Sequence, residues 1–313
     1  MTAAALDSML RSAGAFRHAV FRAVPVQADA VAMYRKWIDE GRSAPLDYME
    51  RWTDVRDDPR LLIPADEGGP ARTLIMALFA YPHPSQVPEA HGIAHFAHAV
   101  TDYHTALKAA LLPVASSIDA AFASVSRVLV DSAPLRERYW AARAGLGVIR
   151  RNNHLYADGY GANFHIAAIA TSADLPGARE LPGIDLRVAC ASGCRCCVDA
   201  CPTGALRADG TLDCSRCLSC VTIETARAEQ PAGLPRAGAV FGCDVCRSVC
   251  PYTANSMVAP LIDGLRPNPA LAEAPAWQSM TASQFRRQFG GTALRRAALK
   301  GILNNLRYAA GGR

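Results

Sequence analysis

All 11 cysteines of this 313-residue chain lie from Cys190 to Cys250, and their spacing favours iron–sulfur chemistry. Two runs share the pattern Cys-x2-Cys-x3-Cys-Pro: one ends at Cys201-Pro202 and the other at Cys250-Pro251. This is the spacing of bacterial two-cluster ferredoxins, in which the cysteine before proline binds the other cluster. The sequence therefore predicts two 4Fe–4S clusters.

Disulfides and zinc are the other chemistries that so many cysteines can serve. A disulfide framework needs an oxidising compartment and usually a small chain with little core, whereas 50% of this chain is hydrophobic. Asp7, Arg11 and Arg17 interrupt the N-terminal segment, so we expect no secretory signal and a cytoplasmic protein. We also expect no membrane span, because no apolar run of about 18 residues is uninterrupted. Zinc ribbons have no need of the Cys-x3-Cys-Pro endings.

Nearly 190 residues precede the cysteines, which predicts a second unit that receives the electrons. Residues 5–50 and 101–123 have the patterns of helices, whereas 73–81, 126–131 and 163–176 are typical of buried strands, the last followed by a loop. Pro134 is expected in the first turn of a helix that runs to about Ala144. This order of strands and helices predicts an α/β or α+β layer domain.

Asp131 is a candidate catalytic residue because it ends the predicted strand 126–131. Ligand sites of layered sheets collect at the carboxyl ends of strands. A carboxyl group in a dry site there can have a raised pKa and serve as a proton donor near neutral pH. The alternative is a turn or capping aspartate that accepts hydrogen bonds from backbone amides. Position alone leaves both interpretations open.

Two further motifs are weak. His91 and His95 are four residues apart, as on one face of a zinc-binding helix, but nothing nearby is spaced to complete the ligand set. Residues 143–149, RAGLGVI, lack the third glycine of a dinucleotide-binding fingerprint. We expect neither a zinc site nor a dinucleotide site.

The segment from Thr281 to Arg313 carries seven basic residues and no acidic residue, although the net charge of the whole chain is only +5. Positive charge concentrated in this way suits a phosphate backbone. The alternative is a solvated helix face whose arginines pair with acids elsewhere in the chain. The sequence leaves both open.

Several strings, taken together, resemble the epoxyqueuosine reductase family. They occur in the same order from about residue 35 to 308: TDYH (101–104), VDSAPLRERYWAARAGLGVI (130–149), CVDACPTGAL (197–206), RCLSCVTIE (216–224), FGCDVCRSVCPY (241–252) and FRRQFGGTALRRAALKGILNN (285–305). The resemblance implies an enzyme that uses cobalamin and two 4Fe–4S clusters. It reduces the epoxide on a modified base of the tRNA anticodon to an alkene, which is the last step of queuosine synthesis. The family is in turn similar to reductive dehalogenases.

The resemblance also implies roles for individual residues. Asp131 would donate a proton to the epoxide oxygen, and Tyr103 and His104 would lie near the cobalamin and the substrate. One cluster would be held by Cys190, Cys194, Cys197 and Cys250, and the other by Cys201, Cys217, Cys243 and Cys246. Cys196, Cys214 and Cys220 remain unassigned. Because Cys190-x3-Cys194 is one residue longer than the usual step, Cys196 stays open as an alternative to Cys190.

For the whole chain, the resemblance implies an α+β fold. It would comprise an α/β cobalamin-binding domain (1–180), an inserted ferredoxin-like two-cluster domain (185–256) and a basic helical segment (257–313) that packs back on the first domain. We expect the tRNA anticodon stem–loop and an external low-potential electron donor as partners. We also expect a monomer, since no heptad pattern is visible.

Two alternatives to this function remain. One is a related corrinoid and iron–sulfur reductase acting on a small-molecule epoxide or organohalide, against which the acid-free basic C-terminal segment argues. The other is a pure electron-transfer protein, which absence of bound corrinoid after reconstitution would favour.

Overall fold

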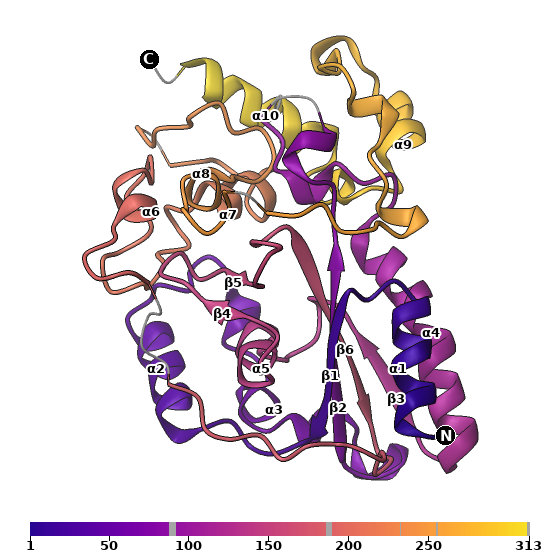
Figure 1. Cartoon of the computed structure of the whole chain (residues 1–313). Helices are drawn as coiled ribbons and strands as arrows, with labels where there is room; N and C mark the ends of the chain where they lie inside the picture. Colours follow the sequence, from indigo (N-terminus) through magenta and orange to yellow (C-terminus); the bar gives the residue numbers. More distant parts are fainter. Residues whose placement is uncertain (88–91, 186–189, 232, 255, 312–313) are drawn as a thin grey trace.

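The computed structural model describes residues 1–87, 92–185, 190–231, 233–254 and 256–311. A four-stranded sheet forms the centre of the first half of the chain (Figure 1). Its order is β1-β2-β6-β3, and every neighbouring pair is antiparallel; the strands are β1 (Arg17–Arg22), β2 (Thr73–Ala80), β3 (Ser126–Leu129) and β6 (Phe164–Thr171). Because β2 and β3 both run opposite to β6, their carboxyl ends point toward the end of the sheet at which β6 begins.

The central strands are those that the sequence predicts most directly. Every residue of β2 is buried, as expected of a continuous apolar run, and β6 and β3 fall within the other two predicted strands. The prediction of helices throughout 5–50 is wrong at β1, which lies between α1 (Ala3–Ser12) and α2 (Ala28–Asp39). This edge strand carries charged residues at both ends, so its local pattern lacks the apolar continuity of β2.

Helices cover both faces of the sheet (Figure 1). On one face, α1 and α4 (Tyr103–Phe122) share a buried core with Ile75 and Ile169 of the sheet. On the other face, α5 (Glu137–Arg143) places Trp140 against Phe21, with ring centroids 5.7 Å apart. The short helix α3 (Thr53–Asp57) lies on this side too. Each fully buried large apolar side chain stabilises the fold by roughly 1.5–3 kcal/mol.

Helix α4 fixes the position of the residues at its start. Its N-cap is Asp102, whose side chain accepts a hydrogen bond from the His104 amide, and it contacts β3, β6 and α1. By length and composition, α4 is the one helix of the described ranges that is long and apolar enough to cross a membrane. Its residues Leu107 and Ile118 are fully buried in the core with α1 and the sheet, as in a core helix.

The prediction that Pro134 lies in the first turn of a helix is wrong, because α5 begins only at Glu137. After β3 the backbone of Asp131 adopts a left-handed conformation (φ 56°), which reverses the chain. The amide of Ser132 then donates to the Val130 carbonyl at 2.5 Å. The residues directly after β3 thus form a turn, and the helix begins only after that turn. A small hairpin follows α5, formed by β4 (Val148–Ile149) and β5 (Leu155–Tyr156).

The second half of the chain contains short helices that carry or flank the cysteines, followed by a helical C-terminal segment (Figure 1). The short helices are α6 (Cys196–Asp199), α7 (Leu218–Ile223) and α8 (Val245–Ser248), and the later ones are α9 (Ala282–Phe289) and α10 (Ala298–Gly311). Short 3-10 helices among the described residues lie at Asp47–Met49, Pro59–Leu62, Ala65–Glu67, Pro84–Gln86, His95–Ala97, Asp263–Leu265, Pro269–Leu271, Trp277–Ser279 and Ala293–Arg296.

A third core joins these segments. Phe289 and Phe285 of α9 pack with Trp277, and the same buried cluster contains Phe241 and Ile93. Asn305 of α10 adds two hydrogen bonds, donating to the carbonyls of Thr222 at 2.8 Å and Val240 at 2.7 Å. The C-terminal segment is therefore packed against the cysteine-rich region and against residues that precede α4.

Candidate active site and cluster ligands

Asp131 follows β3, at the end of the sheet where β2 ends and β6 begins. Its carboxylate accepts a hydrogen bond from the Tyr103 hydroxyl at 2.6 Å, and the same oxygen lies 3.4 Å from His104 Nε2. Its backbone amide donates to the Glu137 carboxyl group at 2.8 Å. The left-handed φ is uncommon outside glycine, although aspartate tolerates it better than most residues, and such strain is frequent at active sites. The structure brings together all three predicted residues: Tyr103, His104 and Asp131.

His104 is held between two carboxylates. Its Nδ1 atom lies 2.7 Å from Asp102 Oδ1, on the side opposite Asp131. Asp102 is itself buried, and its other oxygen lies 3.6 Å from Arg295 Nε in the basic C-terminal segment. The N-cap of α4 thus orients the imidazole and connects it to that segment.

The Tyr103 ring is stacked between two imidazoles. Its centroid lies 4.0 Å from that of His104 and 4.2 Å from that of His165, which is nearly parallel to it at 8°. His165 is buried at the start of β6, and burial lowers its pKa to about 3, so that this ring is neutral. Burial, followed by the charge of Asp131, raises the pKa of Tyr103 well above its ordinary range. Tyr103 is therefore a neutral phenol that donates to Asp131.

The charges of the site differ from the prediction that Asp131 has a raised pKa. Desolvation acts in that direction, but the hydrogen bonds from His104 and Tyr103 outweigh it and lower the pKa of Asp131 to about 2. For His104, desolvation is outweighed by Asp102 and Asp131, and the pKa rises to about 9. Near pH 7 the shared proton therefore rests on His104. Burial and the charge of Asp131 raise the pKa of Glu137 to about 8, so Glu137 holds a second proton.

High solvent exposure combined with strong desolvation indicates that these side chains border a concave surface, which we call the recess. The Asp131 side chain is 60% exposed, although surrounding protein desolvates it strongly. Arg138 and Tyr48 are likewise exposed yet desolvated, and the raised pKa of Tyr48 reflects burial and then the charges of Glu224 and Asp131. Tyr48, Asp131 after β3 and Glu224 of the cysteine-rich region therefore lie near one another.

His95, one half of the weak zinc motif, has another role, and His91 lies outside the described residues. His95 Nδ1 lies 2.7 Å from Asp244 Oδ2 and 2.7 Å from Arg247 Nη2. Arg247 is fully buried and also donates to Asn163. This network joins the loop before α4 to the second Cys-Pro run. Among the described residues, no group of three or more His, Cys, Asp or Glu side chains closes around a single metal ion.

Two thiols have neighbours that match the two ligand sets implied by the family resemblance. The pKa of the Cys197 thiol is raised by burial and by three neighbouring thiolates, those of Cys250, Cys190 and Cys194. The pKa of the Cys246 thiol is raised by burial and then by Cys243, Cys217 and Cys201, with Cys197 last. Helices α6 and α8, each from a different run, are in contact. The chain thus crosses between the sets, as in two-cluster ferredoxins.

The unassigned cysteines differ in their surroundings. Cys196 is exposed, and its sulfur lies 3.9 Å from that of Cys194. Cys190 instead accepts a hydrogen bond from the Arg151 amide at 3.4 Å, and its charge contributes to the raised pKa of the Cys197 thiol. This proximity to Cys197 favours Cys190 over Cys196 as a ligand. Cys214 and Cys220 are both buried, and the pKa of the Cys220 thiol is raised by burial and then by Cys214.

Some basic residues of the C-terminal segment pair with acids elsewhere in the chain, and others remain available to phosphates. Arg295 and Arg296 pair with Asp102 and Glu224. Four other basic residues are exposed and have no acidic partner within the described part of the chain: Arg286, Arg287, Lys300 and Arg307. The segment therefore keeps uncompensated positive charge while two of its arginines reach acids beside the recess.

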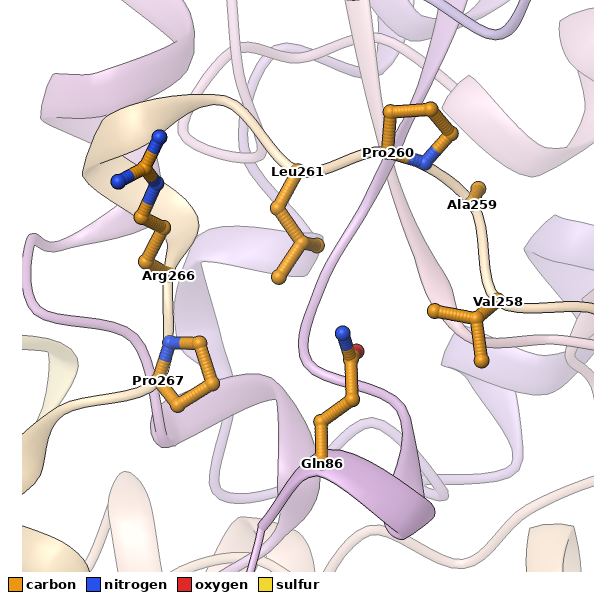
Figure 2. A pocket seen from close by; sticks show the side chains of 7 residues that line it. All are labelled: Gln86, Val258, Ala259, Pro260, Leu261, Arg266 and Pro267. Carbon is orange, nitrogen blue, oxygen red and sulfur yellow. The ribbon is translucent and has the colours of Figure 1, made fainter.

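A separate groove of about 620 Å³ lies between the 3-10 helix at Pro84–Gln86 and the segment 258–267. Figure 2 shows Gln86 and Leu261 pointing into the same space. None of the predicted site residues lines this groove.

The sequence did not single out Asp102, Glu137 or His165 as members of the site. Asp102 had the clearest signal, because an aspartate immediately before a helical pattern is a typical N-cap. Glu137 and His165 come next to Asp131 only through the reversal after β3 and the pairing of β3 with β6.

Comparison with known proteins agrees with this geometry. A model of the 4Fe–4S double cluster binding domain matches residues 189–253. The epoxyqueuosine reductase of Cyclobacterium marinum is 33% identical over 278 residues, which cover 87% of this chain and 85% of the relative. That of Cellulophaga algicola is 32% identical over 280 residues, covering 87% of each chain.

Solved structures show the same fold. A crystal structure of epoxyqueuosine reductase with an epoxyqueuosine-modified tRNA-Tyr stem loop has a TM-score of 0.83, at 23% identity, and covers 99% of this chain and 80% of that one. The structure of epoxyqueuosine reductase from Streptococcus thermophilus has a TM-score of 0.75, at 25% identity, with the same coverage.

The protein is thus an iron–sulfur oxidoreductase in which a double-cluster domain is joined to an α+β domain with a polar recess. The predicted fold class and the two clusters are confirmed. By its similarity to these relatives, the chain belongs to the epoxyqueuosine reductase family.

Proposed function

We propose that this chain reduces the epoxide of epoxyqueuosine in tRNA to the alkene of queuosine, using cobalamin and two 4Fe–4S clusters. The observation that carries the proposal is the hydrogen-bonded array of Tyr103, Asp131 and His104 at the border of the recess. Membership of the epoxyqueuosine reductase family supports the reaction and the cofactors.

The clusters are assigned to the two sets of thiols. In this proposal one cluster is bound by Cys190, Cys194, Cys197 and Cys250, and the other by Cys201, Cys217, Cys243 and Cys246. The mutual effects of these thiols on their pKa values support the assignment, since charges act in this way only on near neighbours. The domain division is proposed as 1–180, 185–256 and 257–313.

Cobalamin is proposed to occupy the recess, where Tyr103, His104 and Asp131 would contact it or the substrate. When bound, it supplies a low-valent cobalt, a strong nucleophile or reductant that no side chain can replace. The residues fit such a group because the recess is open, polar and bordered by both halves of the chain.

The side chains supply the protons. Conversion of an epoxide to an alkene takes two electrons and two protons and releases water. His104 holds one proton near pH 7, and Asp131 lies between it and the open recess. As negative charge develops on the epoxide oxygen, a proton passes from His104 through Asp131 to that oxygen. Tyr103 orients the carboxylate, and Glu137 holds a second proton beside it.

The basic C-terminal segment is proposed to bind the tRNA anticodon stem–loop. Its exposed residues Arg286, Arg287, Lys300 and Arg307 are available to phosphates. A solved relative contains an epoxyqueuosine-modified tRNA stem loop. Recognition of RNA usually engages splayed single-stranded bases, which suits a target base that must enter a recess. The proposal includes an external low-potential electron donor, a monomeric state and a cytoplasmic location.

Anaerobic reconstitution with iron, sulfide and cobalamin tests this function. The protein is then incubated with epoxyqueuosine-containing tRNA and a reductant, and nucleosides are analysed by mass spectrometry. Queuosine is the expected product. No conversion by protein that holds both clusters and cobalt would instead favour a small-molecule epoxide or organohalide, and clusters without cobalt would leave an electron carrier.

A further inference from the structure

The β4–β5 hairpin of the first domain lies against one of the two sets of thiols. The backbone amide of Arg151, in the turn of the hairpin, donates to the sulfur of Cys190 at 3.4 Å. Tyr156, the last residue of β5, packs with Cys250 in a small buried cluster, and both side chains are buried. Cys190 and Cys250 belong to the same proposed cluster, so one hairpin contacts two of its four ligands.

The Tyr156 hydroxyl has one hydrogen left to donate, and the Cys250 thiol, which packs beside it, is among its nearby acceptors. The oxygen of this hydroxyl accepts a hydrogen bond from Asn152 Nδ2 at 2.8 Å, so the hydroxyl hydrogen is free to be donated elsewhere. The side chains of Cys250 and Thr253 are the other groups within hydrogen-bonding reach. The Thr253 hydroxyl donates to the Arg247 carbonyl at 2.7 Å. Of the two acceptors the thiolate is charged, and hydrogen bonds to charged acceptors are the stronger ones.

Asn152 connects this hydroxyl to the backbone of Cys246. Its amide group also donates to the carbonyl of Cys246 at 2.8 Å, so both amide hydrogens are used. Asn152 is buried, as Tyr156 is. The asparagine therefore ties the tyrosine to the backbone of the second Cys-Pro run, four residues before Cys250.

We propose that Tyr156 is a potential-tuning residue: its hydroxyl donates to the Cys250 thiolate and raises the reduction potential of the cluster which that thiolate ligates. Hydrogen bonds to ligand sulfurs are among the factors that set cluster potentials. Reduction adds negative charge to the cluster and its sulfurs, so a donor stabilises the reduced form more than the oxidised form. The inference rests on the proposed function in one respect, namely that Cys250 is a cluster ligand.

The consequence is a functional link between the two halves of the chain. A residue of the domain that borders the recess sets how readily one cluster accepts an electron. Without this bond, the same external donor would keep a smaller fraction of that cluster reduced.

The test is a redox titration of the reconstituted full chain, followed by electron paramagnetic resonance of both clusters. Tyr156→Phe removes the hydroxyl alone. We expect both clusters to be retained and the ratio of reduced to oxidised form of one cluster to fall about tenfold at a fixed potential, equivalent to about 59 mV for one electron. An unchanged potential for both clusters would overturn the inference.

Tyr81→Phe is the matched control. Tyr81 is also a buried tyrosine, but its hydroxyl donates to the backbone carbonyl of Ala162 at 3.0 Å. This variant loses a comparable hydrogen bond without touching a thiol, so both cluster potentials should match the unmodified protein. An equal shift in both variants would show a general loss of packing and would also overturn the inference.

A second variant keeps the test decisive if Tyr156→Phe loses iron. Incorporation of 3,5-difluorotyrosine at position 156 preserves the ring and makes the hydroxyl a stronger donor, so one potential should rise; no rise would contradict the proposal. Cys250→Ala separates the two levels of the argument. Full iron content in that variant would refute the ligand assignment, whereas iron loss combined with no shift in Tyr156→Phe would refute the tuning role alone.

Discussion

Replacing Asp131 by asparagine removes one negative charge from the array and leaves the shape of the side chain almost unchanged. In the intact site Asp131 and Asp102 together raise the pKa of His104 from 6.5 to about 9. This difference corresponds to about 3 kcal/mol in favour of the imidazolium, at 1.36 kcal/mol for each pH unit. With Asp131 neutral, only Asp102 opposes desolvation, so His104 should titrate between these two values.

The rate of turnover should fall much more than this change in charge implies. Asp131 stands between the proton on His104 and the recess, and a positioned proton-transfer group contributes roughly 10²–10⁴-fold to a rate. Asparagine carries no transferable proton, so we expect Asp131→Asn to form queuosine at least about 10²-fold more slowly. Iron and cobalamin contents should be unchanged.

The assay is single-turnover formation of queuosine, measured by nucleoside mass spectrometry from pH 6 to 10. In the unmodified protein the rate should fall as pH rises through about 9, where His104 loses its proton. The same raised pKa contributes stability that is complete below pH 6.5 and lost as pH rises through about 9. Asp174→Asn, a carboxylate just beyond the far end of β6, is the control. A normal rate in Asp131→Asn with both cofactors bound would refute the proton pathway.

Three further results are expected. Cys196→Ser should retain all the iron of both clusters, because Cys190 is placed to be the ligand; iron loss in this variant would show that the first run uses Cys196. Phe289→Ala should lower the free energy of unfolding by about 3–5 kcal/mol, measured by denaturant titration, because this ring is fully buried. A double variant, Arg286→Ala with Arg287→Ala, should weaken tRNA binding at low salt and reduce the slope of log affinity against log salt by about one for each phosphate that the arginines neutralise; an unchanged slope would place the RNA elsewhere.

The parts of the fold that the sequence predicted correctly are those specified by local pattern. β2 is a continuous apolar run because both of its faces are covered, and α4 is long and rich in alanine and leucine. β1 was missed because it is an edge strand whose pairing with β2 depends on residues more than 50 positions away. Pro134 was misplaced because the left-handed turn at Asp131 delays the next helix.

The site shows the same division. The cysteine spacing is a local signal and predicted the two clusters. The pKa of Asp131 is not local, since it depends on Tyr103 and His104, which α4 brings to the end of β3. A buried carboxyl group considered alone should have a raised pKa. The hydrogen-bond donors of Asp131 come from another element, α4, and they lower its pKa instead.

The backbone at Asp131 also limits what a substitution at this position can reveal. With φ at 56°, an alanine or glutamate there brings conformational strain in addition to its new chemistry, whereas asparagine and glycine tolerate the angle. In an alanine scan across this loop, a loss of activity at position 131 would therefore combine the effect of a distorted main chain with that of the missing carboxylate. The same backbone angle favours only a few residue types at this position. The chain reversal that places the carboxylate at the recess therefore also limits which amino acids can replace it without strain.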